Sequence, residues 1–277
     1  MRGIPGSMKR KVWFALGTAT LVAAPLLHGP LPSAARPQGH PILVAQAGEG
    51  GERSHRNGGP AAEDSDLPRN VRLLRDLHVI RGHLLAADEL IRESRWPAAL
   101  SHCRHAEVMH SGMGKDLNAY SLASSATTLK AIVRAVRARN KSDYETALAK
   151  LQQSLDGADG NVRMQESNWP AFVVETVLEL LRNAAAEYDQ AIENGRIVRA
   201  IEYQDARGIA LEAEKLFATV AEPLAVQDAD AVRAARMAFT ELHKAWPAPV
   251  PPRNAARETS AVISDMSRIE LQIGRFR

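Results

Sequence analysis

Apolar residues recur every three or four positions along almost the whole chain after Pro68, and this period constrains the fold more than any other feature. In residues 70–94, for example, Leu77 follows Leu74 after three residues, and Leu84 follows Leu77 after seven, which is about two helical turns. Such steps place apolar side chains on one face of an α-helix. The alternating period of a half-buried strand is missing. The sequence therefore predicts an all-α protein.

Turn signals divide this region into about eight helices. Breaks such as SGMG at residues 111–114 and DGADGN at residues 156–161 separate them. Short connections favour antiparallel neighbours, so we expect an antiparallel helical bundle over residues 69–277. A division into two packed sub-bundles near residues 156–168 stays open. The predicted helices cover residues 70–94, 96–110, 116–139, 144–155, 170–193, 196–221, 228–246 and 256–276.

The N-terminal segment predicts export. A basic stretch at residues 9–11 precedes an apolar run at residues 12–27, which is shorter than a usual membrane span and is interrupted by a glycine and a proline. Small residues follow, so we predict a signal peptide over residues 1–47, cleaved near residue 35 or residue 47. The expected location is periplasmic or secreted. An uncleaved anchor is the alternative, and it would be the only contact with a membrane.

Residues 48–68 are rich in glycine, proline and charge, which predicts a disordered linker. The chain has 277 residues and a formal net charge of +3. Many of the positive residues lie near the N-terminus, and the remainder is close to neutral. We therefore expect no nucleic-acid partner.

Residues 99–113, ALSHCRHAEVMHSGM, concentrate side chains that bind metals. On a helix these side chains separate into two stripes. Imidazole with thioether suits copper, and Glu107-x-x-His110 has the spacing of ferritin-like di-iron bundles, although no second such motif exists here. One stripe carries His102, His105, Met109 and Met113, and the other carries Cys103, Glu107 and His110.

His83 lies on the preceding predicted helix. If the two helices form a hairpin, His83 and His105 differ in level by roughly 6 Å at the rise of an α-helix. His83 then faces His102 and His105, whereas His78 lies about 140° further around its helix and does not join.

We therefore predict that His83, His102 and His105 bind a copper or iron ion, with Glu107 and Met109 as alternative supplementary ligands. The predicted role is binding or delivery in the periplasm rather than turnover. We expect no catalytic residues, because the nucleophile elbow, the zinc-protease motif, the phosphate-binding loop and the glycine-rich dinucleotide fingerprint are all missing from the sequence.

A carboxylate face follows in the predicted helix 196–221. Glu202, Asp205 and Glu212 share it, and it can either complete a metal site or be a solvated face beside nearby arginines. Gly208 interrupts this helix and would allow a neighbouring helix to approach closely.

Residues 81–109, RGHLLAADELIRESRWPAALSHCRHAEVM, resemble a group of uncharacterised exported helical proteins of proteobacteria with a G-H-L element, a turn and H-x-x-H-P. The segments EYQDARGIALEA and SRIEL are similar to parts of the same group. More loosely, the chain resembles imelysin-like, EfeO-type periplasmic metal-binding proteins, which implies a helical bundle with His83, His102 and His105 as ligands. Ala106 stands where this pattern has proline, and Ala86 stands where an imelysin-type H-x-x-E motif has glutamate.

A structural or protein-interaction module is the alternative function. Its helical hairpins would present a groove to a protein of the cell envelope. Cys103 is the only cysteine, so no disulfide can form within the chain, and the fold depends on helix packing or on a bound ligand.

Overall fold

The computed structural model describes residues 67–277. The predicted signal peptide and nearly all of the predicted linker lie outside the described residues. Within the described part, none of the helices combines the length and the apolar character that a membrane span requires.

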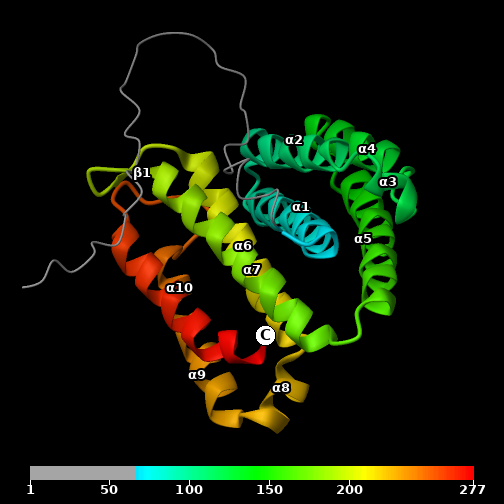
Figure 1. Cartoon of the computed structure of the whole chain (residues 1–277). Coiled ribbons are helices and arrows are strands. Elements are labelled where there is room, and N and C mark those ends of the chain that lie inside the picture. The colour runs from blue at the N-terminus through cyan, green and yellow to red at the C-terminus, as the bar shows by residue number, and fades with distance from the viewer. Residues whose placement is uncertain (1–66) are drawn as a thin grey trace, which may run out of the picture. The chain divides into compact units, whose positions relative to one another are not determined.

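The described chain is helical almost throughout, which confirms the all-α prediction (Figure 1). Ten α-helices and two 3₁₀ turns follow one another, and the only strands between residues 67 and 277 are two of two residues each. The helices are α1 (Arg69–Arg92), α2 (Trp96–Gly112), α3 (Asp116–Ala119), α4 (Ser125–Arg137), α5 (Lys141–Gln165), α6 (Trp169–Ala191), α7 (Ala200–Ala218), α8 (Ala221–Gln227), α9 (Ala229–Leu242) and α10 (Thr259–Ile273), with η1 (His243–Ala245) and η2 (Gly274–Phe276).

Helices α1, α2, α4 and α5 bury one apolar cluster, which we call the N-terminal core. It extends from Leu73 to Val162, and Leu77, Ile80 and Leu129 are fully buried in it. The helical period of the sequence creates this core, because each helix turns one apolar stripe toward the others.

Helices α6, α7, α9 and α10 bury a second apolar cluster, the C-terminal core, together with α8. Apart from Val79 of α1, it begins at Val173. The sequence boundary between the two cores thus lies between Val162 and Val173. Figure 1 shows α9 and α10 on the side of α6 and α7 that is away from α2 and α4. Helix α1 packs against α2 on one side and against α7 and α6 on the other.

Three predictions about the helices of residues 116–165 were wrong. The predicted helix 116–139 is divided into α3 and α4, because Ser121 adopts a positive φ of 60° between them. Helix α5 begins at Lys141, where the Asn140 side chain accepts a hydrogen bond from the Asp143 backbone, rather than at residue 144. It then continues through residues 156–161.

The reason for this continuation is burial. Ala158 and Val162 continue the buried stripe of Leu151 and Leu155, whereas Gly157 and Gly160 are exposed. Packing of the apolar stripe therefore outweighs the roughly 1 kcal/mol that each helical glycine costs.

The prediction that the chain has no strand was wrong at Asn194-Gly195. Helix α6 ends at Ala191, and this pair forms a two-residue hairpin loop between β1 (Ile192–Glu193) and β2 (Arg196–Ile197). Asn194 and Gly195 both have positive φ, 52° and 72°, as the tightest hairpin turns require. Helix α7 consequently begins at Ala200 rather than at residue 196.

Candidate metal centre

Three histidines and one aspartate from three helices meet between the two cores. His83 comes from α1, His102 and His105 come from α2, and Asp205 comes from α7. One ligand atom from each residue lies within 4.8 Å of the other three. The structure therefore brings together His83, His102 and His105, which a hairpin of the first two predicted helices would place side by side.

The Asp205 carboxylate is the centre of this group. Its Oδ1 lies 2.7 Å from Nδ1 of His83 and 2.7 Å from Nδ1 of His102. Its Oδ2 lies 3.0 Å from Nδ1 of His105. The same ring nitrogen of all three histidines thus points at one carboxylate.

Local sequence explains how the helices present these side chains. His102 and His105 are separated by three residues and share one face of α2. Helices α1 and α7 approach so closely that a Cβ on Gly208 would collide with the carbonyl group of Gly82. A Cβ on Gly82 would lie 2.9 Å from the Ile209 backbone. Because the two glycines let α1 and α7 approach closely, the side chain of His83, the neighbour of Gly82, comes within reach of α7.

Gln204 determines which nitrogen of His102 carries a proton. The amide nitrogen of Gln204 donates to the Pro249 carbonyl at 3.0 Å, so its Oε1 is the atom that faces His102. Nε2 of His102 donates to that oxygen at 2.9 Å. In the neutral ring, Nδ1 then has a lone pair directed at Asp205.

The proline-rich connector that holds Pro249 is itself attached to α7. Tyr203 donates to the Ala248 carbonyl at 2.9 Å, and Arg207 donates to the Trp246 carbonyl at 2.5 Å. Three residues of α7, Tyr203, Gln204 and Arg207, thus hold the connector, and Gln204 also orients the imidazole of His102.

The centre is buried, with one side open to solvent. His102 is completely buried, Asp205 is 2% exposed, and the His105 side chain is 19% exposed. Burial alone would raise the pKa of Asp205, but the charge of His83 and hydrogen bonds from the histidines hold it well below its usual range. The hydrogen bond to Asp205 raises the pKa of His105.

A further carboxylate, Glu187 of α6, lies in the field of this centre. Burial, together with the negative charges of Asp205 and Glu202, raises the pKa of Glu187 to about 7. Its charge near neutral pH therefore responds to the charge of the histidine–aspartate group.

The donor set fits a transition metal ion. Imidazole nitrogens and carboxylate oxygens are ligands of iron, zinc and copper, and Gln204 provides the outer hydrogen bond that orients a ligand histidine. Ligand atoms around a tetrahedral ion lie about 3.3 Å apart for bonds of 2.0–2.1 Å. The contacts of 2.7 Å to Asp205 are shorter, so the carboxylate must withdraw by about half an ångström to admit an ion.

The other predicted ligands lie elsewhere on α2. Glu107 is outside the four-residue group, and Met109 packs against both cores. Their roles as supplementary ligands stay predictions from helical spacing. Asp205 was not among the predicted ligands, although its carboxylate face had been recognised as one that can complete a metal site.

Three other residues of the segment 99–113 are buried and belong to the packing of the helices: Cys103, His110 and Met113. Cys103 is fully buried in the N-terminal core, and burial raises the pKa of its thiol to about 12. Met113 lies in the same core. His110 contacts the Leu122 carbonyl through Nε2 at 3.0 Å, and burial lowers its pKa.

Residues 163–276 match the family model of the iron permease-associated 4-helix bundle domain. This segment contains α6, α7, α9 and α10, the four long helices around the C-terminal core. The match relates this segment to an iron-associated helical domain and does not single out the imelysin-like, EfeO-type proteins. Comparisons with curated proteins and with solved structures found no significant match.

The matched segment contains only one member of the histidine–aspartate group, Asp205. His83, His102 and His105 belong to the helices that precede it. The family model therefore does not itself describe the candidate centre.

Proposed function

We propose that this protein binds a transition metal ion, with ferrous iron as its physiological ion, through His83, His102, His105 and Asp205. The observation that carries this proposal is the convergence of three imidazole Nδ1 atoms on one buried carboxylate. The role is binding or delivery, because the centre offers no nucleophile beside a base.

Asp205, which was not among the ligands predicted from the sequence, favours iron over copper. Thioethers select Cu(I), whereas imidazole combined with carboxylate suits Fe(II). Asp205 supplies that carboxylate in the most buried part of the centre, and Met109 packs between the cores. The iron permease association of the matched domain supports the same choice.

Binding in the periplasm is part of the proposal. Support for it comes from the basic and apolar segment at residues 9–27, which lies outside the described residues. Iron would then be received from, or passed to, another component of the cell envelope.

The test is a thermal-shift series on chelator-stripped protein. We expect Fe²⁺, added without oxygen, to raise Tm, because only a ligand that binds the folded state stabilises it. Cu⁺, which prefers thioethers, should raise Tm less, whereas Cu²⁺ and Zn²⁺ bind most nitrogen and oxygen sites at least as tightly as Fe²⁺ and should raise it as well. Asp205→Asn keeps the shape of the side chain but removes its charge, and should abolish the shift. Glu107→Gln is the matched control on α2, outside the four-residue group, and should keep it. A wild-type protein whose Tm responds to none of these ions would refute the proposal.

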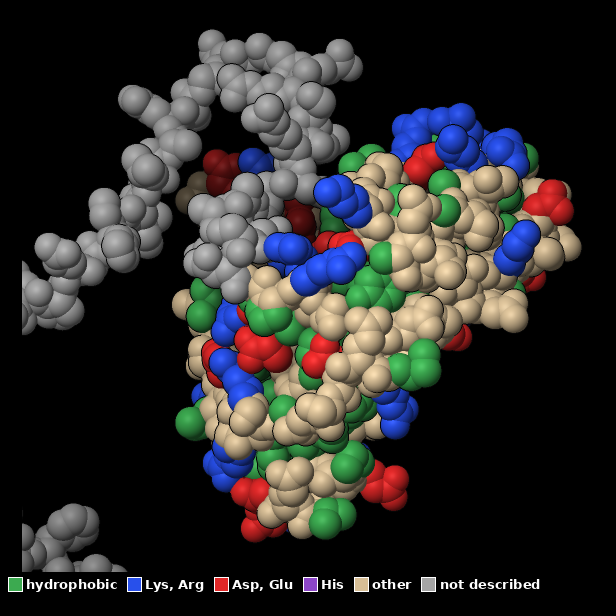
Figure 2. Space-filling model, turned by 45° about the vertical axis from the view of Figure 1, so that its right-hand side comes forward, with side chains coloured by type: hydrophobic (Ala, Val, Ile, Leu, Met, Phe, Trp, Pro, Cys, Tyr) green, Lys and Arg blue, Asp and Glu red, His purple; other side chains and the backbone are tan. Residues whose placement is uncertain are grey.

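The alternative role as a protein-interaction module has less support. Among the described residues, the exposed large apolar side chains are distributed over several elements rather than gathered in one groove. On the face shown in Figure 2, apolar side chains are likewise separated by charged and neutral ones. The exposed residues are Val108, Met164, Val198, Val226, Met237, Ile263 and Leu271.

A further inference from the structure

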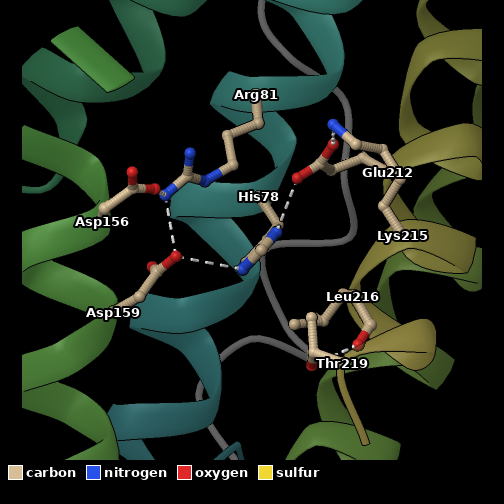
Figure 3. Close-up of polar contacts among 8 residues, drawn as sticks. All are labelled: His78, Arg81, Asp156, Asp159, Glu212, Lys215, Leu216 and Thr219. Carbon is tan, nitrogen blue, oxygen red and sulfur yellow. Dashed lines mark hydrogen bonds and ion pairs between the residues drawn. The ribbon is translucent and has the colours of Figure 1, made fainter. Parts of the chain in front are cut away.

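A second buried histidine lies on α1, five residues before His83. At the rise of an α-helix the two positions are roughly 7.5 Å apart along the axis. Figure 3 shows the His78 ring between two carboxylates, Glu212 of α7 and Asp159 of α5. The His78 side chain is 8% exposed. None of these residues belongs to the candidate metal centre.

One nitrogen of His78 is fixed as a donor. Nδ1 lies 3.0 Å from Glu212 Oε1, and the other Glu212 oxygen accepts from Lys215 at 3.0 Å. Burial alone would raise the pKa of Glu212, but the hydrogen bond from His78 and the charge of Lys215 lower it, so Glu212 is an ionised acceptor at neutral pH. Nδ1 therefore carries the proton, and the neutral ring has its lone pair on Nε2.

That Nε2 atom is buried and has no hydrogen-bond partner. It points at Asp159, whose Oδ2 is 3.6 Å away, too far for a hydrogen bond. Oδ1 of Asp159 is also buried without a partner. A lone pair and a carboxylate thus face each other across a gap, an arrangement that a cation stabilises.

We propose a second cation-binding position in this gap, formed by Nε2 of His78 and the carboxylate of Asp159, for a divalent transition metal ion. The Nε2–Oδ2 distance of 3.6 Å is close to the spacing of about 3.3 Å between two ligands of one tetrahedral ion. Glu212 acts as the outer carboxylate that orients a ligand histidine, as it does in many metal sites.

We expect this position to bind a cation with lower affinity than the four-residue centre does. It offers two protein ligands, so a bound ion keeps water in its other positions. Arg81 also competes for the acid groups, because it donates to Asp159 at 2.8 Å and to Asp156 at 2.9 Å. Burial raises the pKa of Asp159, which adds competition from protons. Weak binding suits an ion that stays briefly before it reaches His83.

Solvent reaches the neighbourhood of this gap. A small pocket between α1, α5 and α7 is lined by Arg81, Leu155 and Glu212, and the Asp159 side chain is 23% exposed.

The test is a calorimetric titration of the chelator-stripped full chain with Co²⁺. We expect one tight and one weak equivalent. His78→Gln and Asp159→Asn should each remove the weak equivalent and keep the tight one, and Asp205→Asn should do the reverse. Glu212→Gln should lower the weak affinity by about 10–100-fold through loss of the orienting carboxylate.

His243→Gln is the matched control. His243 also faces a glutamate, with Nε2 2.8 Å from Glu214, but it should keep both equivalents. The second position is refuted if wild-type protein lacks the weak equivalent, or if His78→Gln and Asp159→Asn, both with a wild-type circular dichroism spectrum, leave that equivalent unchanged. The proposed function is refuted instead if wild-type protein lacks the tight equivalent and keeps the weak one.

Discussion

At the scale of single residues, the candidate centre is a competition between protons and metal for one carboxylate and three imidazoles. Without metal, the contacts of 2.7 and 3.0 Å from Nδ1 of His83 and His105 to Asp205 require protons on those nitrogens. A metal ion must displace those protons, so its affinity falls as the pH is lowered.

The same groups predict how the stability of the metal-free protein depends on pH. The pKa of His105 is raised above its ordinary value of 6.5, so its contribution is complete below pH 6.5 and is lost as the pH rises through the folded-state pKa. The pKa of Asp205 is lowered, so its contribution is present above pH 3.8 and is lost only in stronger acid. We therefore expect Tm of chelator-treated protein to be highest between these values and to decline above pH 6.5.

His105→Gln should flatten that decline above pH 6.5, because glutamine does not titrate. Each unit by which folding raises the pKa of His105 corresponds to about 1.4 kcal/mol of lost stability. Parallel declines of the wild type and the variant would contradict this assignment.

Sequence periodicity accounts for three of the four candidate ligands. The spacing of His102 and His105, and the hairpin geometry that faces them with His83, need only helical rise and twist. The pairing with Asp205 does not follow from such local rules, since α7 begins almost one hundred residues after α2. Glu202, Asp205 and Glu212 looked equivalent in sequence, and only the packing of α7 against α1 distinguishes them.

At the scale of elements, the crossing of α1 and α7 controls the centre. Four contacts follow one another along these antiparallel helices: Arg207 with Glu89, His83 with Asp205, Gly82 with Gly208, and His78 with Glu212. The glycine pair sets the distance between the helices, so both histidine–carboxylate contacts depend on it.

Gly208→Ala should separate the two helices. The added methyl group would meet the Gly82 carbonyl, which is backbone and cannot rotate away. We expect a loss of about 1–3 kcal/mol in the free energy of unfolding, measured by urea denaturation, despite the better helix propensity of alanine. Metal affinity should fall as well, because His83 moves away from Asp205.

Gly157→Ala is the matched control, since nothing lies within 4 Å of the added methyl group in α5. It should stabilise the protein by up to about 1 kcal/mol through helix propensity. If both alanines stabilise the protein, the close approach does not constrain the helices as described.

The limits of sequence-based prediction are also visible at this scale. The existence of most helices followed from the apolar period. Helix ends depended on packing: Ala158 and Val162 carry α5 through two exposed glycines, and Asn194-Gly195 forms a hairpin rather than a simple stop. Gly208 had been recognised as a place for close approach, but Gly82 had not, because its partner helix could not be identified from sequence.

At the scale of the whole described chain, the centre lies where the two cores meet. The segment that forms most of the C-terminal core is similar to the iron permease-associated 4-helix bundle domain, and the N-terminal helices add three of the four candidate ligands. The four-helix segment alone thus lacks most of the donor set. Metal binding should therefore connect the two helical sets, since α1 and α2 share the N-terminal core and α7 belongs to the C-terminal core.

Hydrogen exchange tests this connection. With Fe²⁺ at about 100 times its Kd, the folded state gains about 2.7 kcal/mol, and amides whose exchange requires separation of the two helical sets should slow together. We expect added protection in α1, α2 and α7, with α9 and α10 changing least. Asp205→Asn should abolish the added protection in all three helices. Protection confined to α1 and α2 would mean that the ion binds the histidines without Asp205, and the centre would then not join the two cores.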